Sequence, residues 1–529
     1  MNNRRARTVL ALLSCCFCLS LAQQPGRFNI VLQNAGISSM HTAVTHYGNV
    51  IFLDRTNIGP SAINLVGNCR DNPADMMTTH DCTAHSVIYD PSSNTVRPVF
   101  IYSDTWCSSG QFLPNGTLMQ TGGSADGGSI IRYFTPCSSG SWCNWMESST
   151  NLQSSRWYAS NQILPDGRII VVGGRGVYNY EFQPTGGQFY LQFLKDTADF
   201  QDDNLYPYLH LLPSNLLYIF ANRDSILLNY FTNTVVRKFP TIPGEPRNYP
   251  CSGSSVMLAL DTANSYSKAE VLVCGGANQA SFKSSGPQYG ASQTCGRMEV
   301  TSNSPFWDMS YMPFRRNMGD MVLLPTAKVL IINGAQNGSQ GYLLASNPIL
   351  NPLLYDPDKK TFEIQAPSTI PRVYHSTANL LPDGRVLVAG SNTRYTYQYT
   401  GPFPTELRVE TFSPAYLDAT NDWLRPRIAK NPFTITYGMP FSVDVAIPGK
   451  LVGNIQLTLL SSPFTTHSFS QGQRQLKLPV AASVLSYANT YYVASTAPPS
   501  SGVAPPSYYM LFALHNGIPS QAVWVLVTS

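Results

Sequence analysis

The chain has 529 residues, of which 43% are hydrophobic and 12% are charged, and its formal net charge at pH 7 is +4. This length exceeds what one hydrophobic core usually supports, so we expect two domains or one large repeat array with an attached domain. Because Lys and Arg are scattered instead of clustered, the sequence lacks the basic footprint of a nucleic-acid-binding protein, and no nucleic-acid partner is expected.

The first 22 residues have the pattern of a secretory signal peptide. Arg4, Arg5 and Arg7 precede an apolar stretch that begins near Val9, and small residues lead to an exit at Ala22. We expect cleavage near Ala22 and a protein located outside the cell or in the cell wall. No later segment approaches the roughly 18 uninterrupted apolar residues that span a bilayer, so no membrane span is expected.

Eight of the eleven cysteines lie beyond this segment. An oxidising compartment favours their pairing. Cys69 and Cys82 are close in sequence, as are Cys137 and Cys143, and both pairs have loop-like surroundings rich in Asn, Ser and Gly. We predict these two disulfides.

The other four cysteines are Cys107, Cys251, Cys274 and Cys295. If Cys107 has another chemical role, three remain, and only two of them can form a disulfide. One of Cys251, Cys274 and Cys295 must then stay unpaired, and Cys274, inside the apolar run EVLVCGG, is expected to be the free one. The sequons at Asn115 and Asn337 predict a glycoprotein.

Seven short β-branched runs recur along the chain, each introduced by a turn and often closed by Gly-Gly. They are GNVIFLD from Gly48, NGTLMQTGG from Asn115, DGRIIVVGG from Asp166, SNLLYIFAN from Ser214, AEVLVCGG from Ala269, AKVLIINGA from Ala327 and DGRVLVAGS from Asp383. Their spacing of roughly 50 to 70 residues is near the ~50 of kelch repeats, each of which forms one four-stranded propeller blade. Helical periodicity is absent. The sequence predicts an all-β protein with a seven-bladed kelch-type β-propeller.

The spacing breaks after Asp383, and from about Glu410 the strand-like runs change character. PFSVDVAI, NIQLTLL, TYYVAST and QAVWVLV alternate in the manner of a β-sandwich. We therefore predict a signal peptide over residues 1–22, a propeller over 23–408 and a second β domain over 409–529.

Three chemically unusual residues share one register within the repeats. Cys107, Tyr158 and His375 open the segments CSSGQFLPNG, YASNQILPDG and HSTANLLPDG, nine residues before the glycine of the turn (116 minus 107, 167 minus 158, 384 minus 375). Equivalent positions of different blades lie at equivalent radius and height. These side chains, with Tyr374 beside His375, are expected to meet near the propeller axis.

Such a group offers oxygen and nitrogen donors. This mixture suits square-planar or tetragonal Cu(II) and is poorly suited to a closed zinc site. One more ligand is required, and His467 stands out in TTHSFSQGQRQLKLP, after a strand of the second domain. A loop from that domain could plug the central channel and deliver His467 to one copper ion.

Eight segments also carry a family resemblance along essentially the whole mature chain. They are WCSSG from Trp106, RWYAS around Tyr158, VVGGR ending at Arg175, YPCSGSSVMLAL from Tyr249, RRNMGDMVLLP from Arg315, PRVYHSTANLLPDGRVLVAGSN around Tyr374 and His375, FPTELRVETFSPAYL from Phe403, and TTHS at His467. In these segments the chain resembles glyoxal oxidase and galactose oxidase, the copper radical oxidases, and most closely the glyoxal (aldehyde) oxidase side.

The resemblance implies a role for each residue of the site. Tyr158 is implied to be a copper ligand whose ring is bonded to the sulfur of Cys107, and this thioether-linked tyrosine holds the radical. Tyr374 is implied to be the axial ligand and proton acceptor, and His375 and His467 the two nitrogen ligands. The second domain, 409–529, is implied to be an immunoglobulin-like β-sandwich.

This constellation predicts an oxidase that needs no nicotinamide or flavin. Oxidising an aldehyde hydrate or an alcohol removes two electrons, whereas Cu(II) accepts one, so the tyrosine radical supplies the second oxidising equivalent. Tyr374 would take the substrate proton, and O2 would reoxidise the site and give hydrogen peroxide. Small aldehydes, converted to carboxylic acids, are the expected substrates.

One position departs from the galactose oxidase pattern. Gly176 aligns with a tryptophan that stacks on the modified tyrosine in that enzyme, which argues against galactose as a substrate. Trp106 and Trp157 are the candidates to replace this aromatic cover.

Two alternatives stay open. The first is a galactose-oxidase-type primary alcohol oxidase. The second is a non-catalytic kelch module that binds cell-wall glycan or a protein, because the propeller fold alone does not specify an activity. Association with the cell wall or with a peroxidase is a further expectation.

Overall fold

The structure, a computed structural model, describes residues 25–138, 141–283 and 286–529, so the predicted signal peptide lies outside the described residues. The described chain is almost entirely β-structure, with one short α-helix, α1 (Gln192–Asp196), and a few 3₁₀ turns. The expected all-β class is therefore confirmed. No helix within these ranges is both long and apolar enough to cross a membrane.

All seven predicted runs form strands, and each lies in a different antiparallel sheet. They are β3 (Val50–Leu53), β9 (Leu118–Thr121), β13 (Ile169–Val172), β17 (Leu217–Ala221), β22 (Glu270–Gly275), β26 (Val329–Ile332) and β32 (Val386–Gly390). Nearly all of their side chains are buried on both faces of the sheet. Their β-branched content reflects this burial, because such side chains pack well on a pleated surface.

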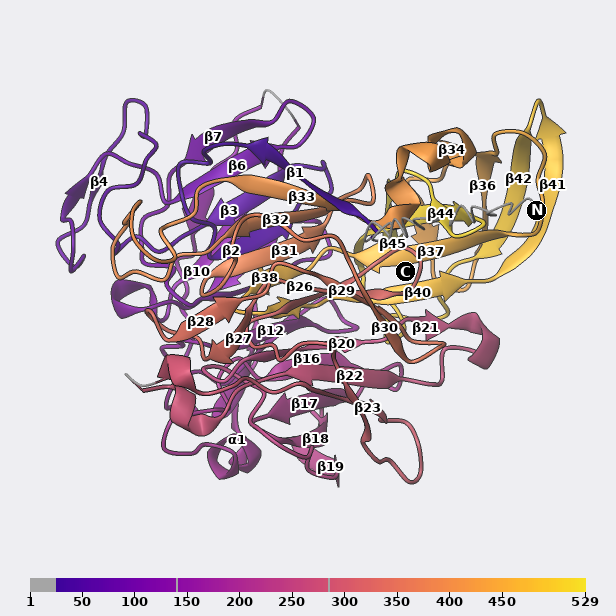
Figure 1. The fold of residues 1–529 in the computed structure, drawn as a ribbon. Coiled ribbons are helices and arrows are strands. Elements are labelled where there is room, and N and C mark those ends of the chain that lie inside the picture. The colour runs from indigo at the N-terminus through magenta and orange to yellow at the C-terminus, as the bar shows by residue number, and fades with distance from the viewer. Residues whose placement is uncertain (1–24, 139–140, 284–285) are drawn as a thin grey trace, which may run out of the picture.

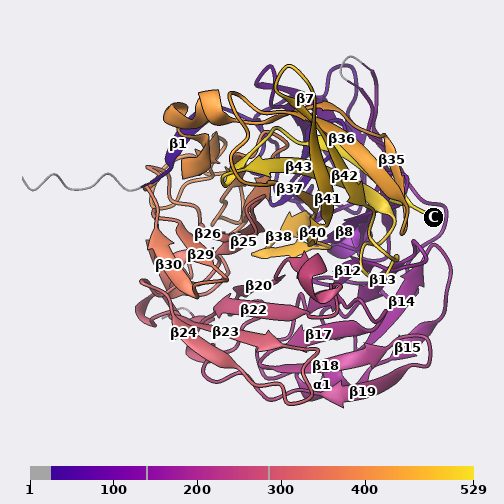
Figure 2. The same ribbon diagram turned by 90° about the vertical axis from the view of Figure 1, so that its right-hand side faces the viewer.

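Each of these runs pairs on its inner side with another strand. These inner strands are β2 (His41–Val44), β8 (Ser109–Phe112), β12 (Ser160–Ile163), β16 (Tyr208–Leu211), β20 (Gly253–Met257), β25 (Asp320–Leu323) and β31 (Ser376–Leu380). Six of the seven neighbouring pairs of inner strands are in contact around the ring, and β38 (Phe464–Thr466) contacts both members of the seventh pair, β2 and β8. Figure 2 shows the sheets arranged around a common centre. In the sheet of β31 and β32, β1 (Arg27–Leu32) pairs with β33 (Val409–Ser413), so the two ends of this region close the ring together.

A hairpin from the C-terminal part of the chain occupies the middle of the ring. Its first strand, β38 (Phe464–Thr466), pairs with β2 and contacts β8, and its second, β39 (Phe469–Gln471), contacts β12, β16, β20 and β25. His467 and Ser468 form the turn between the two strands. Figure 1 places β38 among the ring strands.

Two further sheets form the C-terminal region. One contains β34 (Arg427–Lys430), β36 (Pro440–Ala446), β42 (Thr490–Thr496) and β41 (Val480–Tyr487). The other contains β21 (Leu260–Asp261), β40 (Gln475–Leu478), β37 (Ile455–Ser461), β43 (Ser507–His515), β45 (Val523–Thr528) and β35 (Thr434–Thr436). The four predicted runs of this region correspond to β36, β37, β42 and β45.

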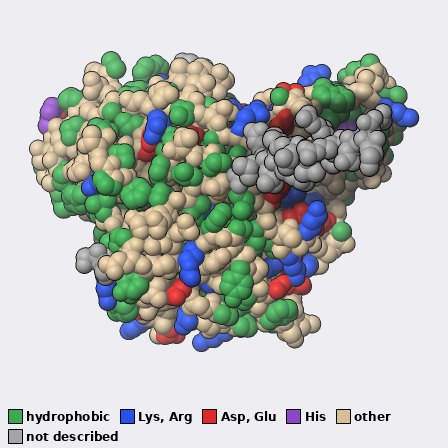
Figure 3. Space-filling model, in the orientation of Figure 1, with side chains coloured by type: hydrophobic (Ala, Val, Ile, Leu, Met, Phe, Trp, Pro, Cys, Tyr) green, Lys and Arg blue, Asp and Glu red, His purple; other side chains and the backbone are tan. Residues whose placement is uncertain are grey.

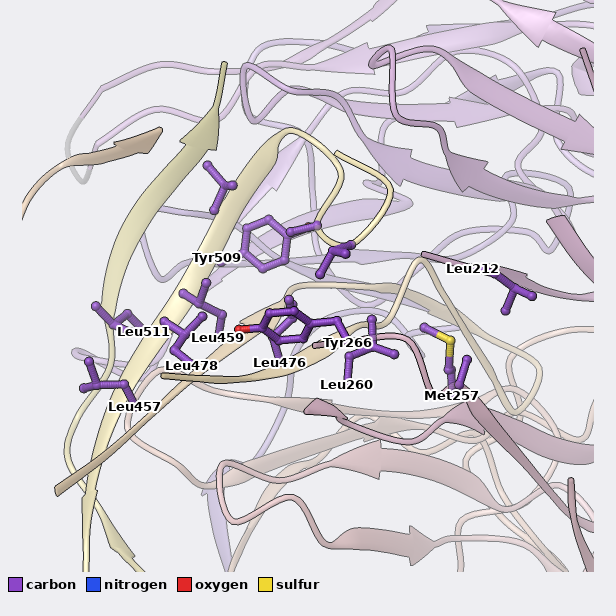
Figure 4. Close-up of a cluster of buried hydrophobic side chains, with 14 of the residues drawn as sticks. Leu212, Met257, Leu260, Tyr266, Leu457, Leu459, Leu476, Leu478, Tyr509 and Leu511 are labelled. Atoms are coloured by element: carbon purple, nitrogen blue, oxygen red, sulfur yellow. The ribbon is translucent and has the colours of Figure 1, made fainter. Parts of the chain in front are cut away.

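The ring and the C-terminal sheets share one hydrophobic core. β21, which belongs to the ring segment of the chain, pairs in parallel with β40, opposing Leu260 to Leu476. Figure 4 shows Met257 and Leu260 in the same cluster as Leu457 and Leu476. Burying one such apolar side chain stabilises the folded state by about 1.5 to 3 kcal/mol. This packing therefore holds the C-terminal region against the ring of sheets.

Three disulfides lie in the described ranges. Cys69–Cys82 and Cys137–Cys143 confirm the two predicted pairs. The third bridge, Cys274–Cys295, shows that the expectation of a free Cys274 was wrong.

The third bridge arises from strand pairing. Cys274 and Cys295 are directly opposite each other on β22 and its neighbour β23 (Thr294–Glu299), with Cα atoms 4.1 Å apart. Cys251 is buried and free, as is Cys107. An apolar strand run therefore did not exclude a disulfide, because the partner strand placed a second cysteine at the same register.

Charged side chains of both signs are interspersed on the face of the molecule that Figure 3 draws. This distribution agrees with the sequence, in which no basic cluster was found.

Candidate copper-binding active site

The three residues of the shared register have the same backbone conformation. Cys107, Tyr158 and His375 lie one or two residues before the inner strands β8, β12 and β31, with φ values of 52°, 69° and 66°. A left-handed non-glycine residue costs about 1 kcal/mol or more and is common at functional sites. Tyr206 and Met318 share both features of these residues. Their φ values are 49° and 53°, and each lies nine residues before a turn (215 minus 206, 327 minus 318). Sequence reasoning missed these two, although the spacing that identified the first three also applies to them.

The predicted residues meet at the centre of the ring. The backbone N–H of Tyr158 donates to the carbonyl oxygen of Cys107 at 3.0 Å, which fixes the two neighbouring sheets side by side. The Cys107 Sγ atom lies 3.2 Å from Nε2 of His467. A ligand atom from each of Cys107, His375 and His467 lies within 4.8 Å of the other two, and all three residues are buried. The C-terminal hairpin therefore brings His467 to the residues of the ring.

Three tyrosine hydroxyls form a row beside this group. The Tyr158 and Tyr249 hydroxyl oxygens are 3.1 Å apart, and those of Tyr249 and Tyr374 are 3.2 Å apart. The Tyr374 ring stacks on the His375 ring with centroids 3.7 Å apart. Tyr249 was not among the predicted site residues, and it follows no shared spacing that could have identified it.

The aromatic rings that stack on Tyr158 do not come from position 176, which is a glycine. A Cβ atom at Gly176 would meet nothing within 4 Å. The ring of Trp157 lies 4.7 Å from the Tyr158 ring at an angle of 32°, and the Tyr249 ring stacks on it at 4.4 Å and 26°. Trp106 packs edge-on against Trp157 instead. Trp157, one of the two candidates, therefore covers Tyr158 together with Tyr249.

Hydrogen bonds determine which nitrogen of His467 is free. His41 Nε2 donates to the Thr105 carbonyl oxygen at 3.0 Å, and burial lowers the pKa of His41 to about 3, so Nδ1 of His41 is an acceptor. Thr466 Oγ1 lies 2.8 Å from that nitrogen and 3.3 Å from the Met40 carbonyl oxygen, so its one hydrogen is donated to one of these acceptors. The Thr466 oxygen therefore accepts from Nδ1 of His467 at 2.6 Å. Nε2 of His467 therefore carries no hydrogen and presents its lone pair toward Cys107.

Burial keeps the site in its uncharged form. Loss of hydration lowers the pKa values of His375 and His467 well below the usual histidine range, and it raises those of Tyr158, Tyr374 and Cys107 well above theirs. Both imidazoles are therefore neutral at physiological pH, which is the form that binds a metal ion.

The residues fit a copper ion. Nε2 of His375 is buried and has no hydrogen-bond partner among the described residues, which costs free energy unless another group binds this nitrogen. Two neutral imidazoles and two phenol oxygens form the mixed nitrogen and oxygen donor set that Cu(II) favours.

An all-β ring whose centre holds a buried cysteine, tyrosines and two neutral histidines is the arrangement of a copper radical oxidase. The comparisons with known proteins agree. Residues 40–416 match the family model described as the glyoxal oxidase N-terminus, and residues 425–527 match the galactose oxidase-like early set domain. The chain belongs to the glyoxal oxidase family and is an oxidase. The alternative of a non-catalytic kelch module is therefore rejected.

Several relatives extend over most of the chain. It is 52% identical over 514 residues to the aldehyde oxidase GLOX of Vitis pseudoreticulata, covering 96% of this chain and 98% of that protein. It is 42% identical to the aldehyde oxidase GLOX1 of Arabidopsis thaliana, covering 95% and 85%. A fungal alcohol oxidase solved in complex with copper has the same fold, with a TM-score of 0.74 at 18% identity over 96% of this chain and all of that one.

Proposed function

We propose that the protein is a secreted copper radical oxidase that converts small aldehydes to carboxylic acids and reduces O2 to hydrogen peroxide. The observation that carries this proposal is the convergence of Cys107, Tyr158, Tyr374, His375 and His467 from four separate parts of the chain on one buried point. The names of the plant relatives support an aldehyde as the substrate.

In this proposal Tyr158, Tyr374, His375 and His467 hold one copper ion. The ion, when bound, supplies a Lewis acid and accepts one electron. The neutral imidazoles and the unpartnered Nε2 of His375 support this ligand set.

The radical cofactor would form from Cys107 and Tyr158. The thiol S–H and one ring C–H next to the phenol oxygen are lost, a C–S bond forms, and the two hydrogens reduce one O2 to hydrogen peroxide. The hydrogen bond between the two backbones keeps the side chains of neighbouring sheets together for this reaction.

Turnover then divides between two tyrosines. Tyr374 accepts the hydroxyl proton of an aldehyde hydrate, and the Tyr158 radical takes the hydrogen atom from the substrate carbon. In sum, the hydrate loses two electrons and two protons to become the acid, and O2 gains both to become hydrogen peroxide. The buried surroundings exclude water and so protect the radical.

The remaining expectations are part of the same proposal. The seven sheets of the ring would be the blades of a kelch-type propeller, followed by an immunoglobulin-like sandwich. The sequence predicted the domain boundary between residues 408 and 409; because β33 (Val409–Ser413) pairs with β1 and β32 in a sheet of the ring, we propose that the boundary lies between β33 and β34 instead. The pattern of residues 1–22 supports secretion to the cell exterior or cell wall, with glycans at Asn115 and Asn337. The hydrogen peroxide produced there would serve the cell wall or a peroxidase.

Peroxide release tests this proposal. Copper-loaded, oxidant-activated protein is offered methylglyoxal, glyoxal, galactose and glycerol, and we expect release with the two aldehydes. Release with galactose or glycerol alone would instead show a primary alcohol oxidase. Silence on all four substrates by protein that holds copper would contradict the proposal.

A further inference from the structure

Tyr249 contacts two residues of the predicted radical site, Tyr158 and Tyr374. Its ring lies on the Tyr158 ring with centroids 4.4 Å apart and 26° between the planes. Its hydroxyl oxygen is 3.1 Å from that of Tyr158 and 3.2 Å from that of Tyr374. The side chain is 6% exposed and also faces the edge of His467.

The backbone around Tyr249 is fixed on both sides. Its main chain forms a bridge with Leu205, and the carbonyl oxygen of Pro250 accepts from the backbone N–H of Gln340 at 3.0 Å. The neighbouring Asn248 donates from its side chain to the Tyr206 carbonyl oxygen at 2.9 Å. The backbone that carries the Tyr249 side chain is therefore held by two other segments of the chain, one at residues 205–206 and one at Gln340.

The hydroxyl of Tyr249 lies between those of Tyr158 and Tyr374, and it has a single hydrogen to donate. Its one hydroxyl hydrogen can be donated to Tyr158 or to Tyr374, but not to both. The 3.1 Å separation allows the Tyr249 hydroxyl to donate to the Tyr158 oxygen.

We propose that Tyr249 is a positioning residue that controls the oxidation of Tyr158, with its hydroxyl acting on the phenol oxygen and its ring shielding the phenol face. This inference rests on the proposed function, since it requires Tyr158 to be oxidised. Copper binding would release the phenol proton of Tyr158 to solvent and hold the side chain as a phenolate. Oxidation then removes one electron from this phenolate, which an added oxidant such as ferricyanide accepts, and leaves a neutral radical.

The two parts of Tyr249 have opposite effects. A hydrogen bond stabilises the charged phenolate more than the neutral radical, so the hydroxyl makes the electron harder to remove. The stacked ring excludes water and other reactants from the phenol face, so it prolongs the life of the radical. Removing only the hydroxyl and removing the whole ring should therefore be distinguishable.

A redox titration of the copper-loaded, cross-linked holoenzyme tests this. Ferricyanide accepts the electron, and the oxidised tyrosine is followed by its visible absorption and by electron paramagnetic resonance. In Tyr249→Phe we expect the midpoint potential to fall, equivalent to at least about a tenfold change in the oxidation equilibrium. In Tyr249→Leu we expect the oxidised form to decay faster than in the wild type.

Tyr208→Phe is the control. Tyr208 is a buried tyrosine whose hydroxyl donates to the carbonyl oxygen of Arg247 and whose ring packs on Phe469. Its loss should leave the midpoint potential unchanged. An unchanged potential in Tyr249→Phe with copper and the cross-link intact would overturn the role of Tyr249 alone. A wild-type protein that binds copper but yields no oxidised tyrosine would overturn the proposed function and this inference with it.

Discussion

The sulfur of Cys107 lies 3.2 Å from Nε2 of His467, although 360 residues separate them in the chain. Cys107 belongs to the ring of sheets and His467 to the hairpin that fills its centre. The site is therefore complete only when the C-terminal region is seated on the ring. The predictions below follow from this geometry and from the packing around it.

Replacing His375 or His467 with Ala should remove most copper binding while the protein stays folded, because each substitution deletes one nitrogen donor from a small ligand set. Copper per protein, measured by elemental analysis together with a circular dichroism spectrum, checks this. His515→Ala is the control, since this histidine ends β43 in the C-terminal sheet and its Nε2 donates to the carbonyl oxygen of Val452. Copper near one equivalent in His375→Ala would show that the ligand is misassigned.

Thr466→Val should lower copper affinity by about 10- to 100-fold, the usual cost of losing a partner that orients a metal-binding histidine. The valine keeps the shape of the side chain but cannot accept from Nδ1 of His467. Thr466→Ser should restore the affinity, because it keeps the hydroxyl. Nitrogen NMR of the metal-free proteins gives a second readout, in which His467 changes tautomer only in the valine variant.

Cys107→Ser should keep copper and lose nearly all turnover, because the serine oxygen cannot form the thioether with Tyr158. In copper-treated wild-type protein, peptide mass mapping should find the peptides of Cys107 and Tyr158 joined. The joined species should be about two mass units lighter than their sum and should resist thiol reductants, unlike a disulfide. Separate peptides with Cys107 still open to alkylation after turnover would contradict the radical mechanism.

Removing the bridge between Cys274 and Cys295 with a double alanine substitution should lower the free energy of unfolding by about 3 kcal/mol, the value for a loop of this order of length. The two cysteines are 21 residues apart. Urea unfolding measures the effect, with Cys251→Ala as the control for loss of a buried cysteine that is unpaired. Equal losses in the two proteins would mean that the bridge adds nothing beyond packing.

Asp320 should make the protein less stable as pH rises. Burial raises the pKa of Asp320 to about 8, and the amide of Asn333, which donates to it at 2.8 Å, only partly offsets this. The folded state therefore holds a proton that the unfolded state releases from about pH 4 upward. Relative to Asp320→Asn, wild-type stability should be highest at low pH and fall between about pH 4 and 8, by up to about 1.4 kcal/mol per pH unit. Urea unfolding at several pH values measures this, and a constant difference between the two proteins would contradict it.

Local sequence patterns were sufficient for much of the fold. The seven β-branched runs and the turns before them predicted the strands, because the alternation of buried strand and tight turn is a property of neighbouring residues. The spacing of nine residues also placed Cys107, Tyr158 and His375 in one register. This succeeded because each sheet of the ring repeats the same strand and turn, so equal spacing gives equal position.

The sequence by itself thus determined the all-β class, the strands and the set of residues able to bind a metal. Only the tertiary structure decided which strand places Cys295 opposite Cys274, and which side chains complete the site. Tyr249, His41 and Thr466 follow no common spacing, and they reach the site because segments hundreds of residues apart pack together. Pairing between distant strands and contact between side chains depend on distances in space, which one-dimensional periodicity does not encode.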